Sequence, residues 1–156
     1  MNLYFYPICI CLAILFLTSL VGFSSDVAYA KPAYSKSIAE YSHLVKDNNW
    51  SEAISTALLE TKPGAVLYFP QEVYEVTMPL IIDKDITILL EAGASIVAKN
   101  SKLFVITQGN HITIEGIGGK ACLSSTAEVF YLNALWPRSK PHLELRQLQM
   151  TGSYVI

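Results

Sequence analysis

From Gly64 onward the chain consists of short β-forming runs separated by turn-type residues, with no helical segment between them. The runs are Ala65–Phe69, Val73–Val76, Leu80–Ile82, Ile86–Leu90, Ser95–Ala98, Leu103–Thr107, Ile112–Glu115, Val129–Leu132 and Leu143–Leu148. A fold built from strand–helix–strand units needs a helix between successive parallel strands, so this pattern excludes it. A meander, a barrel or a solenoid remains.

Three features of these runs favour a solenoid, in which successive coils of the chain stack on one another. β-Branched residues occupy alternate positions of the strongest runs. These runs recur at broad intervals, from Val66 to Ile86, then to Ile112, then to Leu143. Dipeptides typical of tight hairpins are scarce, and Gly109-Asn110 suits a solenoid corner equally well. We therefore expect an all-β fold whose coils lie about 4.8 Å apart and whose inward Ile and Leu side chains form ladders.

Before the β-rich region, Trp50–Glu60 predicts one short amphipathic helix. Asn48 or Asn49 is a suitable N-cap, and Pro63-Gly64 ends the run. A second short helix is expected within Ser37–Val45. The apolar residues of the first helix recur at helical spacing and share one face: Ala53, Ile54, Ala57 and Leu58.

The segment 1–30 differs in kind from the rest of the chain. Leu3–Phe23 is almost wholly apolar, and Ala28-Tyr29-Ala30 follows, with small residues at the two positions that a signal peptidase reads. We expect residues 1–30 to be a signal peptide that is removed, which leaves a mature protein that is secreted, periplasmic or displayed at the cell surface. An uncleaved membrane anchor is the alternative, because an apolar run as long as Leu3–Phe23 can span a bilayer.

Charge and cysteine content narrow the partners of the mature chain. It carries 11 basic and 12 acidic residues, so it offers no basic surface to nucleic acid. Binding to an acidic polysaccharide stays compatible with this net charge, because local patches of charge matter more than the total charge of the chain. Cys122 is alone once Cys9 and Cys11 are removed, so no intrachain disulfide forms, and its apolar neighbours predict a small buried side chain.

The order of these features resembles the N-terminal rungs of the pectate-lyase-like superfamily, which includes polygalacturonases, pectin and pectate lyases and phage tailspikes. The resemblance implies a right-handed parallel β-helix of about four rungs over residues 47–156, with a short N-terminal capping helix and a polar lead-in over residues 31–46. The matching segments are Trp50–Glu60 with Gly64–Pro70 and Tyr74 for the cap and first rung, Ile86–Ile96 for the second rung of the polygalacturonase branch, Asn110–Gly119 for the third and His142–Gly152 for the fourth.

The residues that catalyse hydrolysis in polygalacturonases are missing from this sequence. The signatures Asn-Thr-Asp, Asp-Asp, Gly-His-Gly and Arg-Ile-Lys do not occur, and the aspartates of the mature chain are Asp47, Asp83 and Asp85, which we interpret as solvated turn residues. Glycoside hydrolysis needs two carboxyl groups that face each other across the bond, one of them protonated. We therefore assign no catalytic or substrate-binding residue and expect no metal and no cofactor.

A second departure from the family concerns a turn. The family has glycine two residues after the proline of Phe69-Pro70, where this sequence has Glu72. A left-handed backbone would cost glutamate about 1–2 kcal/mol, so we expect the turn to have a different shape here.

The outward positions of the third and fourth rungs hold the remaining candidates for chemistry. Glu115, Glu144 and Arg146 either form a small charged stripe or are ordinary exposed side chains. His111 and His142 each begin a strand, one rung interval apart, and either stack on each other or stand as separate corner residues. A calcium-dependent lyase would draw its carboxylates and its basic residue from groups of this kind.

Two further segments bear on partners. Trp136-Pro137-Arg138 lies in an expected loop, where the indole either stacks on a sugar ring or closes a gap in the core wall. Ser153–Ile156 reads as another strand without a polar cap, which indicates a truncated gene product, a remnant or an edge covered by an oligomeric partner.

The sequence therefore predicts an exported pectin-lyase-fold module that lacks its own complete active site, contacts polysaccharide and self-associates through its uncapped C-terminal rung. One alternative is a fragment or subunit of a pectinolytic glycoside hydrolase or polysaccharide lyase. The other is a structural surface or tail-type β-helix protein.

Overall fold

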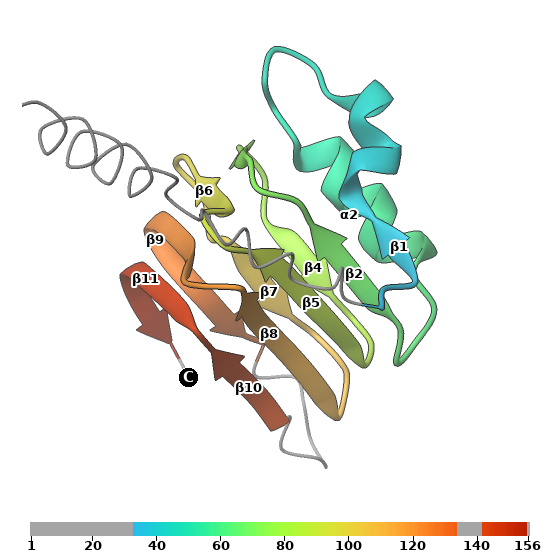
Figure 1. Ribbon diagram of the computed structural model, residues 1–156. Coiled ribbons are helices and arrows are strands. Elements are labelled where there is room, and N and C mark those ends of the chain that lie inside the picture. The colour runs from blue at the N-terminus through green and yellow to red at the C-terminus, as the bar shows by residue number, and fades with distance from the viewer. Residues whose placement is uncertain (1–32, 134–141, 156) are drawn as a thin grey trace, which may run out of the picture. The chain divides into compact units, whose positions relative to one another are not determined.

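The computed structural model describes residues 33–133 and 142–155, which form mostly β-strands with two short helices (Figure 1). Trp136-Pro137-Arg138 and the apolar Leu3–Phe23 lie outside the described residues. The elements are β1 (Lys36–Ser37), η1 (Ile38–Leu44), α2 (Ser51–Glu60), β2 (Val66–Phe69), β3 (Val73–Val76), β4 (Leu80–Ile82), β5 (Ile86–Glu91), β6 (Ser95–Ala98), β7 (Phe104–Ile106), β8 (His111–Ile117), β9 (Ala121–Leu132), β10 (His142–Arg146) and β11 (Leu148–Val155).

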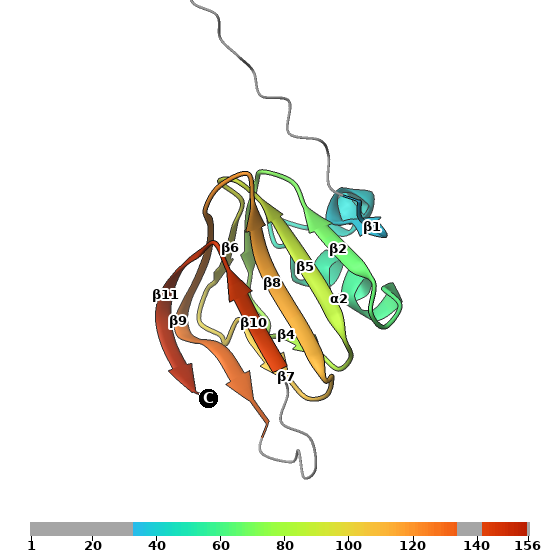
Figure 2. The same cartoon turned by 60° about the horizontal axis from the view of Figure 1, so that its bottom comes forward.

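The strands form two sheets between which the chain passes back and forth. Sheet A has the order β1-β2-β5-β8-β10, and sheet B has the order β3-β6-β9-β7-β4, with β11 also paired to β9. Figure 2 shows β2, β5, β8 and β10 side by side. Every pairing between the named strands of the described residues is parallel, which excludes the antiparallel meander. One passage through sheet A and then sheet B is one coil, and each coil pairs its backbone with the coil before it.

The register of sheet A follows the intervals read from the sequence, with one correction. Ile86 pairs with Ile112, and Ile112 pairs with Leu143, as those intervals predicted. Val66 pairs with Thr87, one position further along than predicted. Residues that pair across two parallel strands face the same side of the sheet. Val66 faces outward, so it pairs with the outward-facing Thr87 and not with Ile86, which faces the core.

The hydrophobic core lies between the two sheets and is built from inward side chains of successive coils. In sheet A, Leu67, Ile88 and Ile114 are fully buried and occupy one column, and the half-buried Leu145 continues it. In sheet B, Phe104 and Phe130 stack with ring centroids 5.6 Å apart and planes 14° from parallel. These ladders of like side chains hold neighbouring coils together, at about 1.5–3 kcal/mol for each fully buried side chain.

Two helices lie on the side of the sheets away from β10 and β11, with η1 against β2 and α2 against β4 (Figure 1). The apolar face of α2 is buried as predicted, with Ala53, Ile54, Ala57 and Leu58 all in the core. The N-cap residue of α2 is Trp50, whose side chain makes no capping hydrogen bond, so the expected asparagine N-cap is wrong by one position. The side chain of the neighbouring Asn49 accepts hydrogen bonds from the Ser51 N–H at 3.0 Å and the Ser51 hydroxyl at 2.7 Å. The expected helix within residues 37–45 is η1, which begins with a capping box between Ser37 and Glu40.

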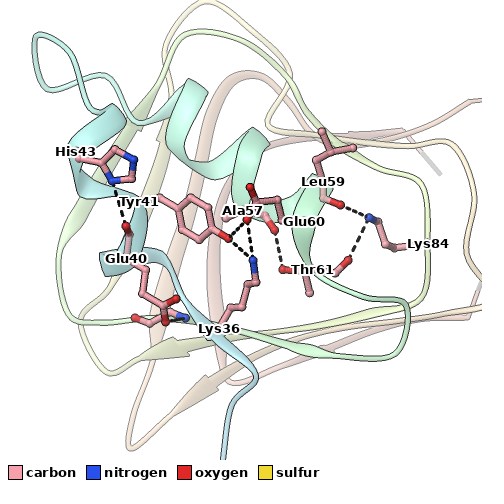
Figure 3. A network of polar contacts seen from close by, with 10 residues as sticks. Lys36, Glu40, Tyr41, His43, Ala57, Leu59, Glu60, Thr61 and Lys84 are labelled. Atoms are coloured by element: carbon pink, nitrogen blue, oxygen red, sulfur yellow. Dashed lines mark hydrogen bonds and ion pairs between the residues drawn. The ribbon is translucent and has the colours of Figure 1, made fainter.

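A polar network ties the segment before α2 to that helix (Figure 3). The Lys36 ammonium donates to the Tyr41 hydroxyl at 2.5 Å and to a Glu60 carboxylate oxygen at 2.8 Å, and the Tyr41 hydroxyl donates to the same oxygen at 2.7 Å. The hydrogen bond from Lys36 lowers the pKa of Glu60, and the same bond raises the pKa of Lys36. The network joins β1, η1 and α2, so residues 36–44 pack with the helix that follows them.

The strand predictions are wrong at two places where polar residues interrupt the apolar pattern. β9 begins at Ala121, well before the predicted Val129, because the inward Ser125 hydroxyl donates to the Ser101 carbonyl at 2.8 Å and accepts from the Ala127 N–H. The predicted run 143–148 is divided at Gln147, whose φ of 51° turns the chain from sheet A to sheet B. Glu72 is absent from the described residues with positive φ, so its turn imposes no left-handed strain.

Replacement of a core ladder residue tests the stacking of coils. Ile88 is fully buried between Leu67 and Ile114, so Ile88→Ala should lower the free energy of unfolding by about 2–5 kcal/mol. Thr87→Ala, its outward neighbour on β5, is the matched control and should cost less than about 1 kcal/mol. Urea denaturation followed by circular dichroism measures both, and equal losses would contradict the inward orientation of Ile88.

Candidate functional site

Polar side chains gather on the outward side of β8 and β10, the last two strands of sheet A. The register places His111 beside His142, Thr113 beside Glu144, and Glu115 beside Arg146. Alternate residues of a strand share a side, and the residues between these point into the core. We call this set of six side chains the β8/β10 face: His111, Thr113, Glu115, His142, Glu144 and Arg146.

An ion cluster occupies the carboxyl end of the β8/β10 face. The Arg146 Nε and Nη2 groups donate to one oxygen of Glu144 at 2.9 and 2.6 Å, and Nη1 lies 3.8 Å from a Glu115 oxygen. The hydrogen bond to Glu144 raises the pKa of the Arg146 guanidinium. The charged stripe considered for these three residues is therefore present, and it remains open to solvent because about half of the Arg146 side chain (54%) is exposed.

The two histidines of the β8/β10 face lie at its amino end. Their imidazole centroids are 6.0 Å apart, with ring planes inclined by 59°, and both residues are exposed. His111 and His142 are therefore neighbours and not separate corner residues, the two arrangements that the sequence left open.

Asp85 supports the corner from which the first of these histidines projects. One carboxylate oxygen of Asp85 accepts hydrogen bonds from the backbone N–H groups of Asn110, at 2.5 Å, and His111, at 3.1 Å. The bond from His111 is the largest cause of a lowered pKa for Asp85, followed by that from Asn110. Gly109 makes the corner possible, because its φ is 116° and a Cβ atom there would lie 2.7 Å from the Lys84 carbonyl oxygen. Asp85 therefore has a structural role that the interpretation as a solvated turn residue missed.

The other two aspartates do not join this site. Asp47 has a left-handed φ of 49° before α2, and Asp83 is exposed beside the Lys84 ammonium at 3.8 Å. The same ammonium donates to the carbonyls of Leu59 and Thr61 at 3.0 and 3.2 Å, near the end of α2. Asp83 therefore contacts the Lys84 ammonium, whereas Asp85 accepts from two backbone N–H groups of the next coil.

Cys122 is not the buried residue that its neighbours predicted. It lies on the outward side of β9 and is half-buried, because Ala121 and Leu123 take the inward positions on either side of it. Its strand neighbours in register are Ser95 and Gln149. Among the described residues, no group of three or more His, Cys, Asp or Glu side chains is arranged to hold a metal ion.

Comparison of the chain with protein-family models, with curated proteins and with solved structures gave no match in any of the three. In the part of the chain that the structure describes, no helix combines the length and apolar character needed to cross a bilayer. Function is therefore inferred from the geometry of the β8/β10 face and from the resemblance read from the sequence.

The charge on Asp85 should stabilise the fold in a pH-dependent way. Its pKa in the folded chain lies below the ordinary value of 3.8, so the stabilisation is present above that value and is lost as the pH falls through the lower one. Asp85→Asn keeps an acceptor oxygen but removes the charge. The variant should therefore be less stable than the wild type near neutral pH, and the difference should shrink between about pH 5 and pH 2.

Asp83→Asn is the matched control, since Asp83 precedes the same turn and has only the ion pair with Lys84. Thermal melting of the three proteins across this pH range gives the comparison. A constant difference between Asp85→Asn and the wild type at all pH values would show that the backbone N–H groups do not depend on the carboxylate charge.

Proposed function

We propose that this chain is an exported right-handed parallel β-helix module of the pectate-lyase-like type, which contacts polysaccharide and lacks a complete active site of its own. Parallel pairing between successive coils supports the fold, as do a helix that caps the first coil and coil intervals close to those read from the sequence. These features belong together in solenoids, where each coil buries its apolar side chains against the next.

The observation that supports sugar contact is the placement of Arg146 on an open polar face. Glu144 accepts from Nε and Nη2, and Glu115 lies near Nη1 without a hydrogen bond. A guanidinium has five N–H donors, so donors remain for a sugar hydroxyl or a uronic acid carboxylate. Thr87 and Thr113 are paired across β5 and β8 next to this cluster and add hydroxyl groups to the same side of sheet A. The remaining guanidinium donors and the threonine hydroxyl groups can each form a hydrogen bond with an oxygen atom of a sugar.

The same cluster favours binding without turnover. Glu115 and Glu144 both lie against the Arg146 guanidinium. A hydrolase needs one carboxyl group that carries a proton and a second that faces it across the scissile bond. Two carboxylates paired with one arginine do not provide that arrangement. An active hydrolase or lyase that contains this chain would need catalytic groups from elsewhere.

Arg146→Ala should weaken binding of the mature chain to polygalacturonate about tenfold, because one charge-assisted contact is lost. Lys99→Ala is the matched control: Lys99 is 53% exposed and pairs with Glu75 at 2.7 Å on sheet B, much as Arg146 pairs with Glu144 on sheet A. Affinity electrophoresis in gels with and without polygalacturonate measures both variants.

Incubation of the mature chain with polygalacturonate distinguishes the alternatives. No new reducing ends and no absorbance of unsaturated products should appear with the wild-type chain. Products that appear with wild type would favour the hydrolase or lyase alternative. Absence of retardation in the gel, or equal weakening by the two substitutions, would contradict sugar contact at the β8/β10 face and favour the structural alternative.

Export is tested at the expected cleavage site. Expression of the full chain in a secreting host should yield a product that begins at Lys31, by mass spectrometry. Ala30→Leu should block processing, because the signal-peptidase pocket accepts only a small side chain there. Tyr29→Leu, at the position between the two small residues, should be processed normally. A wild-type product that keeps residues 1–30 in the membrane fraction would support the anchor alternative.

A further inference from the structure

Three side chains that can bind a metal ion, Asp85, His111 and His142, lie one above another in successive coils. Each lies at or just before the start of a strand of sheet A. Ile86 pairs with Ile112, which places Asp85 next to His111, and His111 pairs with His142. The register between successive coils therefore brings Asp85, His111 and His142 next to one another. The two histidines supply the part of this set that is exposed and faces outward.

We propose that His111 and His142 together bind a divalent transition metal ion such as Zn²⁺ or Ni²⁺. Imidazole nitrogen is a preferred ligand of these ions, with metal–nitrogen distances of about 2.0–2.1 Å. The ring centroids are 6.0 Å apart, and small side-chain rotations of two exposed residues bring one nitrogen of each ring to a shared ion. In the described part of the chain, neither imidazole donates or accepts a hydrogen bond that would have to be broken first.

The backbone fixes the two ligands before an ion arrives. The His142 N–H donates to the Asn110 carbonyl at 2.8 Å, and Asp85 holds the N–H groups of Asn110 and His111. Parallel pairing then continues along both strands. Only the side-chain torsions of the histidines remain to be fixed on binding, so the entropic cost is small.

The charges around the pair favour a cation. The Asp85 carboxylate lies one coil before His111, and one of its oxygens accepts from the His111 backbone N–H at 3.1 Å. The neighbouring Lys84 ammonium is held by carbonyl oxygens near the end of α2. Arg146 lies at the opposite end of β10 from His142 and is paired with Glu144. Asp85 itself is not assigned as a ligand, because its contacting oxygen already accepts two backbone bonds.

A site with two protein ligands leaves the remaining coordination positions to water or to a solute. It therefore differs from a closed structural zinc site with four protein ligands.

The experiment is isothermal titration of the untagged mature chain with ZnCl2 and, separately, NiCl2. One ion should bind per chain near neutral pH. His111→Asn and His142→Asn should each lower the affinity about tenfold or more. His43→Asn is the matched control, since the sequence has three histidines and His43 is the exposed one on η1. Cys122→Ser excludes a contribution from the free thiol and should bind as the wild type does.

A measurement on the wild-type protein alone keeps the proposal testable if a variant folds poorly. In an NMR titration with Zn²⁺, the imidazole resonances of His111 and His142 should shift together while those of His43 stay in place. Shifts of all three histidines in parallel, or binding that survives either single substitution, would overturn the two-histidine site. The result is independent of sugar binding, so failure of one proposal leaves the other intact.

Discussion

The parallel hydrogen bonding between one coil and the next is the interaction on which the rest of the structure depends. It sets the register, and the register decides which residues face the core and which face solvent. The column of Leu67, Ile88 and Ile114 and the outward row that ends in Glu115 and Arg146 are consequences of the same pairing. A shift by one residue would bury the charges and expose the aliphatic side chains.

Much of this arrangement could be predicted from the sequence, because the alternation of apolar residues in a strand and their spacing in a helix depend only on residues close together in the chain. Both helices, most strand positions and the pairing of Ile86 with Ile112 follow from apolar periodicity and interval counting. The first part of β9 could not be found in this way, because its inward Ser125 is polar and is satisfied by the carbonyl of Ser101, one coil earlier in the chain. The outward orientation of Cys122 depends on where that same strand begins.

In the candidate site, too, some contacts could be predicted from residue spacing and others could not. The spacing from His111 to His142 equals the interval from Ile112 to Leu143, and the structure places the two rings side by side. The role of Asp85 required knowledge that a turn in one coil lies beneath the corner of the next. The spacing between Asp85 and His111 was the signal that could have revealed it, since it equals the interval from Ile86 to Ile112.

Stacking also determines how cooperativity is distributed along the chain. In a quasi-one-dimensional array, each unit is stabilised by its own fold and by the interfaces with its immediate neighbours. Separating β5 from its neighbours breaks pairings with both β2 and β8, whereas separating β10 breaks a pairing with β8 alone among the described strands. Among the described strands, opening at β10 therefore breaks fewer pairings than opening at β5. A ligand that contacts both strands of the β8/β10 face would add a second link between β10 and β8 and so contribute to the local order of β10.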